Sequence, residues 1–385
     1  MEDIILNSSL HHYEHCYRTS NLARKVVDLL PDKMASVWGE AVSVEPNNRR
    51  NLNIIQTITP QLEKLRDIYC IGQKTANLYG GCTSLRLVDD DNDWIDEINL
   101  KDVNFVKCSR IFEYWEISPY FPPREIIATI SRDYHNPNYY YYLLSSSTER
   151  YVHKSRIIRF RGAFLPNTLL QRNNYWEDSY LTAFLPKLEQ YDKAIENVAE
   201  TLDSYSIPVI KKKGLINQFG KNLIEVIDGL KSEASKLMGN LSVKKGLLID
   251  GDNVDVSFQQ RSLSGINTII ETLLNDLVAN SYLTRVQLLN EHPKGLQATG
   301  KSEKETESEK IKTMMDTLWG DSIRYDLKLL LAQYKIYDDR IKWQWNNAHQ
   351  PTPLEEIEVK LKELELEEKQ ESFNSSTGND VETVN

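Results

Sequence analysis

Residues 177–205 read EDSYLTAFLPKLEQYDKAIENVAETLDSY and carry the most regular pattern in the chain. Apolar residues recur there with alternating gaps of three and four: Leu181, Phe184, Leu188, Tyr191, Ile195, Val198, Leu202 and Tyr205. This heptad spacing predicts a long α-helix with one narrow apolar seam, which suits packing against one or two similar helices. Pro186 either begins the helix or kinks it, because proline removes an i→i−4 hydrogen bond. An ordinary amphipathic helix in a larger α/β domain fits the same pattern.

Acidic residues dominate the other faces of this predicted helix. They are Glu177, Asp178, Glu189, Asp192, Glu196, Glu200 and Asp203, against only Lys187 and Lys193. A helix of this length spans roughly 40 Å at 1.5 Å per residue. The sequence therefore predicts a long helix with one apolar seam and acidic residues on its other faces.

A second heptad pattern lies upstream. Thr59-Pro60 is typical of a helix start, and Gly80-Gly81 is a strong stop signal. Between the two predicted helices, residues 83–176 contain short, aromatic-rich strand candidates separated by turn signals. The sequence thus predicts a helix–β–helix hairpin that projects from a body built by the rest of the chain.

The remaining residues add a basic strand, a polar loop and further helices. Residues 207–210 read as a strand that continues into Lys211, Lys212 and Lys213. Three adjacent lysines either protect an edge strand from aggregation or form a basic surface that contacts phosphates. A polar loop follows at residues 259–265, beginning with Gln259, Gln260, Arg261 and Ser262. A long helix is predicted over residues 304–337, and residues 351–385 hold ten acids against three lysines.

Composition excludes several classes of protein. The chain has 385 residues, of which 40% are hydrophobic and 26% charged, which allows about two or three globular domains. Its net charge of −10 argues against a sequence-independent grip on nucleic acid, which needs many Lys and Arg side chains. The four cysteines are scattered without a C-x-x-C, which indicates reduced thiols in an intracellular protein. Neither a signal peptide nor an apolar run of transmembrane length is recognisable.

Motifs for catalysis, cofactors and metals are missing or incomplete. No nucleophile elbow, H-E-x-x-H, G-x-G-x-x-G or paired zinc motif occurs. A two-histidine phosphodiesterase needs two H-x-[ST] motifs to supply acid and base, and only His153-Lys154-Ser155 fits. His11 and His15 have the i, i+4 spacing of metal ligands on a helix, but no second ligand cluster accompanies them. We therefore predict that the protein is not an enzyme and binds no cofactor or metal.

Six stretches of the chain form a recognisable series. They are Tyr17–Asp28, Leu78–Gly81, Val152–Phe160, Trp176–Ser179, Lys213–Leu215 and His292–Gly300. In this order they resemble the portal (head-to-tail connector) proteins of tailed bacteriophages, in the compact phage-associated subfamily. The stretch VHKSRIIRF is similar to the family's I-H-x-S-R-V-I-R-F strand, and HPKGLQATG looks like its S-P-x-G-L-N-A-T-G segment. The sequence departs from the family at Asn21, where an aromatic residue is usual, and at Glu177, where glycine is usual.

The resemblance implies a fold and an assembly. The fold is α+β, a portal-like protomer with two long stem helices flanking a small β-rich clip, an α/β wing and a helical crown, assembled as a cyclic ring of about twelve copies. Mapped onto this sequence, the parts are the N-terminal arm and part of the wing at 1–58, the first stem helix at 59–82, the clip and adjoining strand at 83–176, the second stem helix at 177–206, the wing with the channel loop at 207–302, wing and crown helices at 303–350, and the acidic crown helix with a disordered tail at 351–385.

The resemblance also implies a function that is structural rather than enzymatic. Such a ring sits at the unique capsid vertex, conducts double-stranded DNA during packaging and ejection, and docks terminase and then the neck or tail adaptor. The expected partners are other copies of the chain, the terminase large subunit, the head–tail adaptor, the major capsid protein and weakly bound DNA, with no membrane. The expected location is the virion, after assembly in the host cytoplasm.

Each candidate surface receives a role within that framework. The seam Leu181, Phe184, Leu188, Tyr191, Ile195, Val198 and Leu202 joins subunits, so Leu188→Asp is expected to prevent ring assembly. The acidic residues Glu189, Asp192, Glu196, Glu200 and Asp203 face the channel and repel phosphates. Residues 259–262 belong to a loop that narrows the channel, and residues 211–213 form a basic ring. The competing interpretations are a nucleotide phosphodiesterase of the two-histidine type and a self-associating coiled-coil scaffold.

Overall fold

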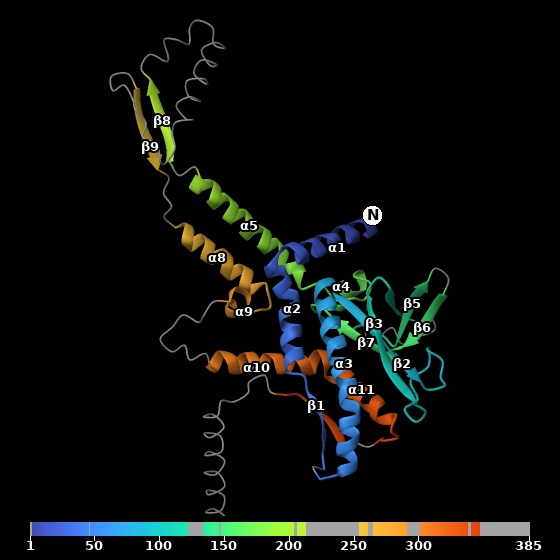
Figure 1. The fold of residues 1–385 in the computed structure, drawn as a ribbon. Helices are drawn as coiled ribbons and strands as arrows, with labels where there is room; N and C mark the ends of the chain where they lie inside the picture. The colour runs from blue at the N-terminus through green and yellow to red at the C-terminus, as the bar shows by residue number, and fades with distance from the viewer. Residues whose placement is uncertain are drawn as a thin grey trace, which may run out of the picture. The chain divides into compact units, whose positions relative to one another are not determined.

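The chain forms two compact units (Figure 1). The computed structural model describes residues 2–45, 47–121, 134–145, 148–203, 206–212, 254–260, 265–290, 301–337 and 340–346. The first unit comprises Met1–Pro186 with Val278–Asn385, and the second comprises Lys187–Leu277.

The first unit begins with three helices and a short strand. They are α1 (Glu2–Thr19), α2 (Asn21–Ser36), β1 (Glu40–Ser43) and α3 (Arg49–Tyr79). Ser20 begins α2 as an N-cap, because its side chain accepts a hydrogen bond from the backbone N–H of Ala23. Gly80 ends α3 in the left-handed conformation, with φ 96°, as the glycine pair in the sequence predicts.

The predicted start of α3 at Thr59-Pro60 is wrong. The helix begins ten residues earlier at Arg49, where the side chain of Asn48 accepts hydrogen bonds from the N–H groups of Arg50 and Asn51. Pro60 lies inside the 31-residue helix. Asparagine is as good an N-cap as threonine, so the capping signal at Asn48 competes with the one at Thr59.

Two antiparallel sheets follow α3. One has the order β3-β2-β7, built from β2 (Gly81–Asp89), β3 (Phe105–Glu113) and β7 (Ile157–Arg161). The other has the order β4-β5-β6, built from β4 (Ile117–Tyr120), β5 (Tyr139–Ser145) and β6 (Thr148–His153). A 3-10 turn at Lys154–Arg156 joins β6 to β7, and the short helix α4 (Asn167–Arg172) comes after β7.

The residues that follow the second unit in the sequence complete the first unit. They form α9 (Arg285–Leu289), α10 (Lys301–Met315), a π-helical turn (Asp316–Gly320), α11 (Asp321–Ala332) and β10 (Ile341–Gln344). Helical residues run without a gap from 301 to 332, so the long helix predicted over 304–337 forms, with the π-helical turn inside it and an end five residues earlier. Strand β10 pairs antiparallel with β1, with Ala41 opposite Trp343.

The main core of the first unit packs α3 against α11 and β7. One face of α3 is buried through Ile58, Leu62, Leu65 and Tyr69, and it meets Trp319 and residues of α11. Gly72 allows the close approach of β7, because a Cβ atom there would lie 2.3 Å from the ring of Phe160. A β-rich cluster that includes Tyr142 and Trp176 forms a second core.

The second unit contains a helix–hairpin–helix arrangement. Helix α5 (Leu181–Asp203) begins in the first unit and continues into the second, where β8 (Ser206–Lys212) pairs antiparallel with β9 (Val254–Gln260). Helix α8 (Ile266–Ala279) leads back, and Lys187 Nζ lies 2.8 Å from Asp276 Oδ2 within this unit.

The chain is therefore divided differently from the sequence prediction. Residues 59–82 and 83–176 belong to the core and sheets of the first unit and do not form a projecting hairpin. The separate helix–β–helix unit lies at 187–277 and includes residues 207–277, which the sequence prediction assigns to the wing. The predicted segment 351–385 lies outside the described residues.

Candidate functional site

The N-terminal part of the α5 seam is buried inside the protomer. The exposed fractions of Leu181, Phe184 and Leu188 are 0%, 0% and 4%. Pro186 lies inside the helix, which begins at Leu181, so proline does not mark its start. The predicted subunit interface is therefore wrong at these three positions, because their own chain already covers their apolar surface.

The following part of the seam is open to solvent. Tyr191 and Val198 are half-buried, and Ile195 is 38% exposed. The side chain of Leu202 lies outside the described part of the structure. Helix α8 in the same unit also exposes apolar surface, most of all at Ile269, which is 60% exposed. The strip from Tyr191 to Val198 can therefore pack against another chain.

The acidic residues of α5 lie where the heptad pattern predicts, away from the seam. Glu189, Asp192, Glu196 and Glu200 are exposed. Partial desolvation raises the pKa of Asp192. Asp203 is the last residue of α5, and its side chain is outside the described residues. The helix thus presents an acidic face on the second unit.

The β8–β9 hairpin contains the predicted basic strand. Lys211 and Lys212 are the last residues of β8, opposite Asp255 and Val254, whereas Lys213 is outside the described residues. The backbone register therefore places an acidic residue across from one of the lysines.

The predicted channel loop at 259–262 is wrong at its first two residues. Gln259 and Gln260 belong to β9 and pair with Ile207 and Ser206. The pairing of β8 with β9 extends to these two glutamines because β8 begins at Ser206, opposite Gln260. Arg261 and Ser262 lie outside the described residues.

His153 has a structural role in the turn between β6 and β7. Its Nδ1 accepts a hydrogen bond from the backbone N–H of Ser155 at 3.3 Å and lies 2.9 Å from Ser155 Oγ. Ser155 Oγ in turn accepts a hydrogen bond from the N–H of Ile98. Burial lowers the pKa of His153, which favours the neutral ring that this capping requires. The H-x-[ST] sequence thus forms a turn cap.

Metal-binding and membrane-spanning features are absent from the residues that the structure describes. No group of three or more His, Cys, Asp and Glu side chains in those ranges is placed to hold a metal ion. No helix within them is long and apolar enough to cross a bilayer.

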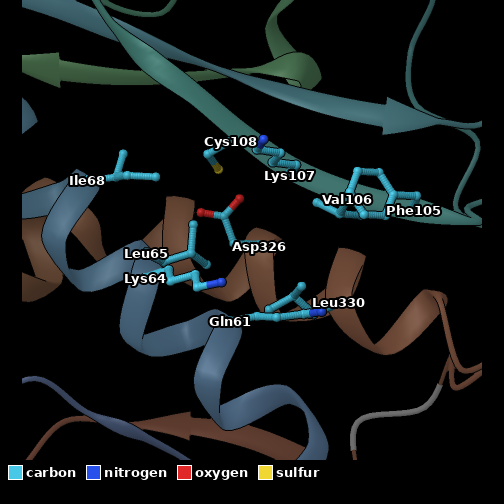
Figure 2. A pocket seen from close by; sticks show the side chains of 10 residues that line it. All are labelled: Gln61, Lys64, Leu65, Ile68, Phe105, Val106, Lys107, Cys108, Asp326 and Leu330. Carbon is cyan, nitrogen blue, oxygen red and sulfur yellow. The ribbon is translucent and has the colours of Figure 1, made fainter.

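A pocket of about 310 Å³ opens between α3, β3 and α11 (Figure 2). Its walls include Leu65 and Ile68 from α3, Val106 from β3 and Leu330 from α11. Lys64 and Lys107 also line it and are exposed. No sequence pattern predicts this pocket, because its walls come from three segments that are far apart in the chain.

Polar groups form part of the pocket. Asp326 is buried there, and its two oxygens bind Arg86 Nε and the hydroxyl of Tyr69. Burial, with a smaller contribution from Asp326, raises the pKa of the Cys108 thiol to about 12. Gln61 Oε1 is buried without a hydrogen-bond partner. The pocket therefore combines mostly apolar walls with the buried ion pair of Asp326 and Arg86.

A family model described as phage portal protein matches residues 11–369 of the sequence. The chain belongs to the phage portal protein family. The portal resemblance inferred from the six stretches is thus confirmed.

Two curated relatives of this portal-family chain carry the name Anti-CBASS protein Acb1. The one from Caulobacter sp. (strain RHG1) is 21% identical over 356 residues, covering 89% of this chain and 55% of the relative. The one from Sphingomonas paeninsulae is 21% identical over 342 residues, covering 83% and 51%. The chain spans about half the length of the curated relatives it matches.

A solved structure supports the fold of this portal-family chain. A chain in the neck of an empty GTA particle, computed with C6 symmetry, superposes with a TM-score of 0.50 at 12% identity, covering 97% of this chain and 91% of that chain. At this identity the likeness concerns the fold alone, and it agrees with the mixed α+β architecture described above.

Proposed function

We propose that the protein is a structural portal subunit whose copies form a closed ring of about twelve members. The observation that carries this proposal is the solvent-exposed apolar strip on α5, Tyr191–Val198, in a chain that belongs to the portal family. Exposed apolar side chains at heptad spacing are stabilised when they pack on a neighbouring helix. The family match and the likeness to a neck component support a place at the capsid vertex of a virion.

We also propose that the second unit supplies the stem and clip of that ring. Helices α5 and α8 are the stem helices, and the β8–β9 hairpin belongs to the clip. The acidic face of α5 forms part of the channel wall, where it repels phosphates and lets double-stranded DNA pass without tight binding. Terminase and then a neck adaptor dock on the ring, and the major capsid protein surrounds it.

The phosphodiesterase alternative is weakened by the geometry of its only H-x-[ST] motif. His153 Nδ1 is occupied by the backbone of its own turn, and burial disfavours the protonated ring. The name of the curated relatives supports no second proposal, because the match covers about half of their length.

Native mass spectrometry of the purified protein, with negative-stain images of the same sample, tests the ring. The expected species has about twelve times the chain mass of 44.6 kDa. In the images it appears as rings with a central hole of duplex width. A protein that stays monomeric or dimeric at high concentration contradicts the proposal, and a rod-shaped oligomer without a hole favours the coiled-coil scaffold.

A further inference from the structure

Phe164 is an exposed aromatic residue on a fixed backbone. Its side chain is 75% exposed, more than any other large apolar side chain within the described ranges. The ring stacks on His135, with centroids 5.1 Å apart and planes 12° apart. This apolar ring is therefore available to pack against another molecule.

Backbone hydrogen bonds fix the two residues before Phe164, which are Gly162 and Ala163. The N–H of Gly162 donates to Gly80 O at 2.9 Å, and Ala163 exchanges two backbone hydrogen bonds with Asp178 at 2.8 and 2.9 Å. A Cβ atom at Gly162 would lie 2.3 Å from Asp178 O, so the segments pack closely there. Phe164 is therefore pre-organised, and little conformational entropy is lost when it binds a partner.

The pocket between α3, β3 and α11 has the properties of a receiving site. Its apolar walls enclose about 310 Å³, and Phe105 beside it is 55% exposed. No described strand pairs with the outer edge of β3, which lines the pocket.

The two features lie at opposite edges and opposite ends of one sheet. Phe164 follows β7, whose Arg161 pairs with Gly81 at the start of β2. The pocket lies beside Phe105 of β3, which pairs with Asp89 at the end of β2. Strand β2 has nine residues, and its ends are roughly 25 Å apart at about 3.3 Å per residue. Phe164 therefore cannot enter the pocket of its own chain.

We propose that Phe164 of one copy inserts into the pocket of the next copy, between Leu65, Val106 and Leu330. A knob on one side of a subunit and a hole on the other form a heterologous interface, which closes into a ring when the rotation between copies is right. This inference rests on the proposed ring and adds a second subunit contact, in the first unit, to the one expected along α5.

Photocrosslinking tests the insertion. p-Benzoylphenylalanine is placed at position 164, and ¹⁴N- and ¹⁵N-labelled chains are mixed, assembled and irradiated. The expected crosslinks join residue 164 to peptides containing residues 61–68 or 105–108, and mixed isotope pairs show that they connect different copies. The matched control places the same photoprobe at Leu169 on α4, which is 45% exposed, and gives no crosslink to those peptides.

The outcomes separate this inference from the proposed function. Rings seen by native mass spectrometry whose position 164 crosslinks to another surface, within its own chain, or not at all overturn the insertion and leave the portal proposal standing. A protein that forms no rings overturns both.

Substitution gives a second readout. Phe164→Ala is expected to leave the thermal unfolding of the monomer unchanged, because the side chain is exposed. It is expected to raise the concentration needed for ring assembly by about tenfold or more, as loss of a central aromatic anchor does. Leu169→Ala serves as the control. Equal assembly of the wild type and Phe164→Ala contradicts the insertion.

Discussion

Asp326 is the residue that ties the first unit together. It lies on α11 and binds Arg86 of β2 and Tyr69 of α3, and all three side chains are buried. Arg86 also donates to the backbone carbonyl groups of Ser155 and Ile157. Burial raises the pKa of the Tyr69 hydroxyl, with Asp326 adding to the shift, so that this group stays a neutral donor.

Removing the charge of Asp326 is expected to destabilise the fold strongly. Asp326→Asn leaves the guanidinium of Arg86 buried without its counterion, and breaking such a pair lowers the free energy of unfolding by about 3 kcal/mol or more. Urea denaturation followed by circular dichroism measures the change. Asp321→Asn on the same helix removes an exposed partner of Arg324 and is expected to have little effect. Equal, small losses in the two variants would show that the buried network is not critical.

His153 is expected to make stability depend on pH. Its folded-state pKa is lowered by burial, so below the usual value of 6.5 the unfolded chain binds a proton more readily than the folded chain. The stability that neutral His153 contributes is present above that value and is lost as the pH falls toward the folded-state pKa.

Thermal unfolding of the wild type and His153→Gln between pH 7.5 and 5.5 checks this expectation. The wild type is expected to lose more stability than the variant, because only the wild type carries this titrating ring. Parallel curves for the two proteins would show that His153 does not contribute to the pH dependence.

At the scale of elements, the sequence predicted α5 and its faces well. Glu189, Asp192, Glu196 and Glu200 are exposed as expected, because helical period alone decides which residues share a face. The prediction is wrong for Glu177, which precedes α5 and is buried beside Arg159. The period does not show which partner covers the apolar stripe. Leu181, Phe184 and Leu188 are covered by their own chain, whereas Ile195 is not, and only tertiary packing distinguishes the two groups.

Two substitutions in that seam are therefore expected to behave differently. Leu188→Asp places a charge at a buried position and is expected to lower the stability of the monomer. Ile195→Asp is expected to leave monomer unfolding nearly unchanged and to abolish ring assembly. Differential scanning fluorimetry and native mass spectrometry of both variants measure these effects. Intact rings of Ile195→Asp would show that the strip Tyr191–Val198 is not a subunit interface.

Helix α3 shows a second limit of sequence patterns. Its apolar positions and its glycine stop were predicted, but its start was displaced because Thr59-Pro60 looks like a first turn. Pro60 stays inside the helix, and the competing cap at Asn48 decides the actual boundary. A heptad-like stripe suits a helix packed on a sheet as well as a stem helix, so the pattern alone does not distinguish the two.

At the scale of the molecule, the prediction of the projecting hairpin is wrong, because it rests on the order of the elements along the chain. The sequence prediction places this hairpin at 59–206, whereas the separate helix–hairpin–helix unit lies at 187–277. Long-range packing decides which helices join the main core, and sequence patterns do not show it. The pocket and the exposed Phe164 depend on the same long-range packing and were not predicted.

The acidic face of α5 is expected to control how DNA interacts with the assembled ring. Glu196→Lys reverses a charge on this face, and the ring repeats the change about twelve times. The variant ring is expected to bind duplex DNA more tightly than the wild type at low salt and to lose the gain as salt rises. Fluorescence anisotropy with a labelled duplex measures both effects.

Glu63→Lys is the matched control for this experiment. Glu63 is exposed on α3 in the first unit, and its replacement makes the same change in net charge. Equal gains in DNA binding by the two variants would show that net charge, rather than a channel wall at α5, governs the interaction.

The pairing of β1 with β10 has a consequence for synthesis. Strand β1 (residues 40–43) cannot form its backbone hydrogen bonds until β10 (residues 341–344) has been synthesised. Met34 and Trp38 pack in the same core as Ile341 of β10. A ribosome adds about 5–20 residues per second, so the emerging chain spends many seconds with that apolar surface uncovered. Chaperone capture is therefore expected on nascent chains that still lack β10, and subunits become competent to meet one another only after release.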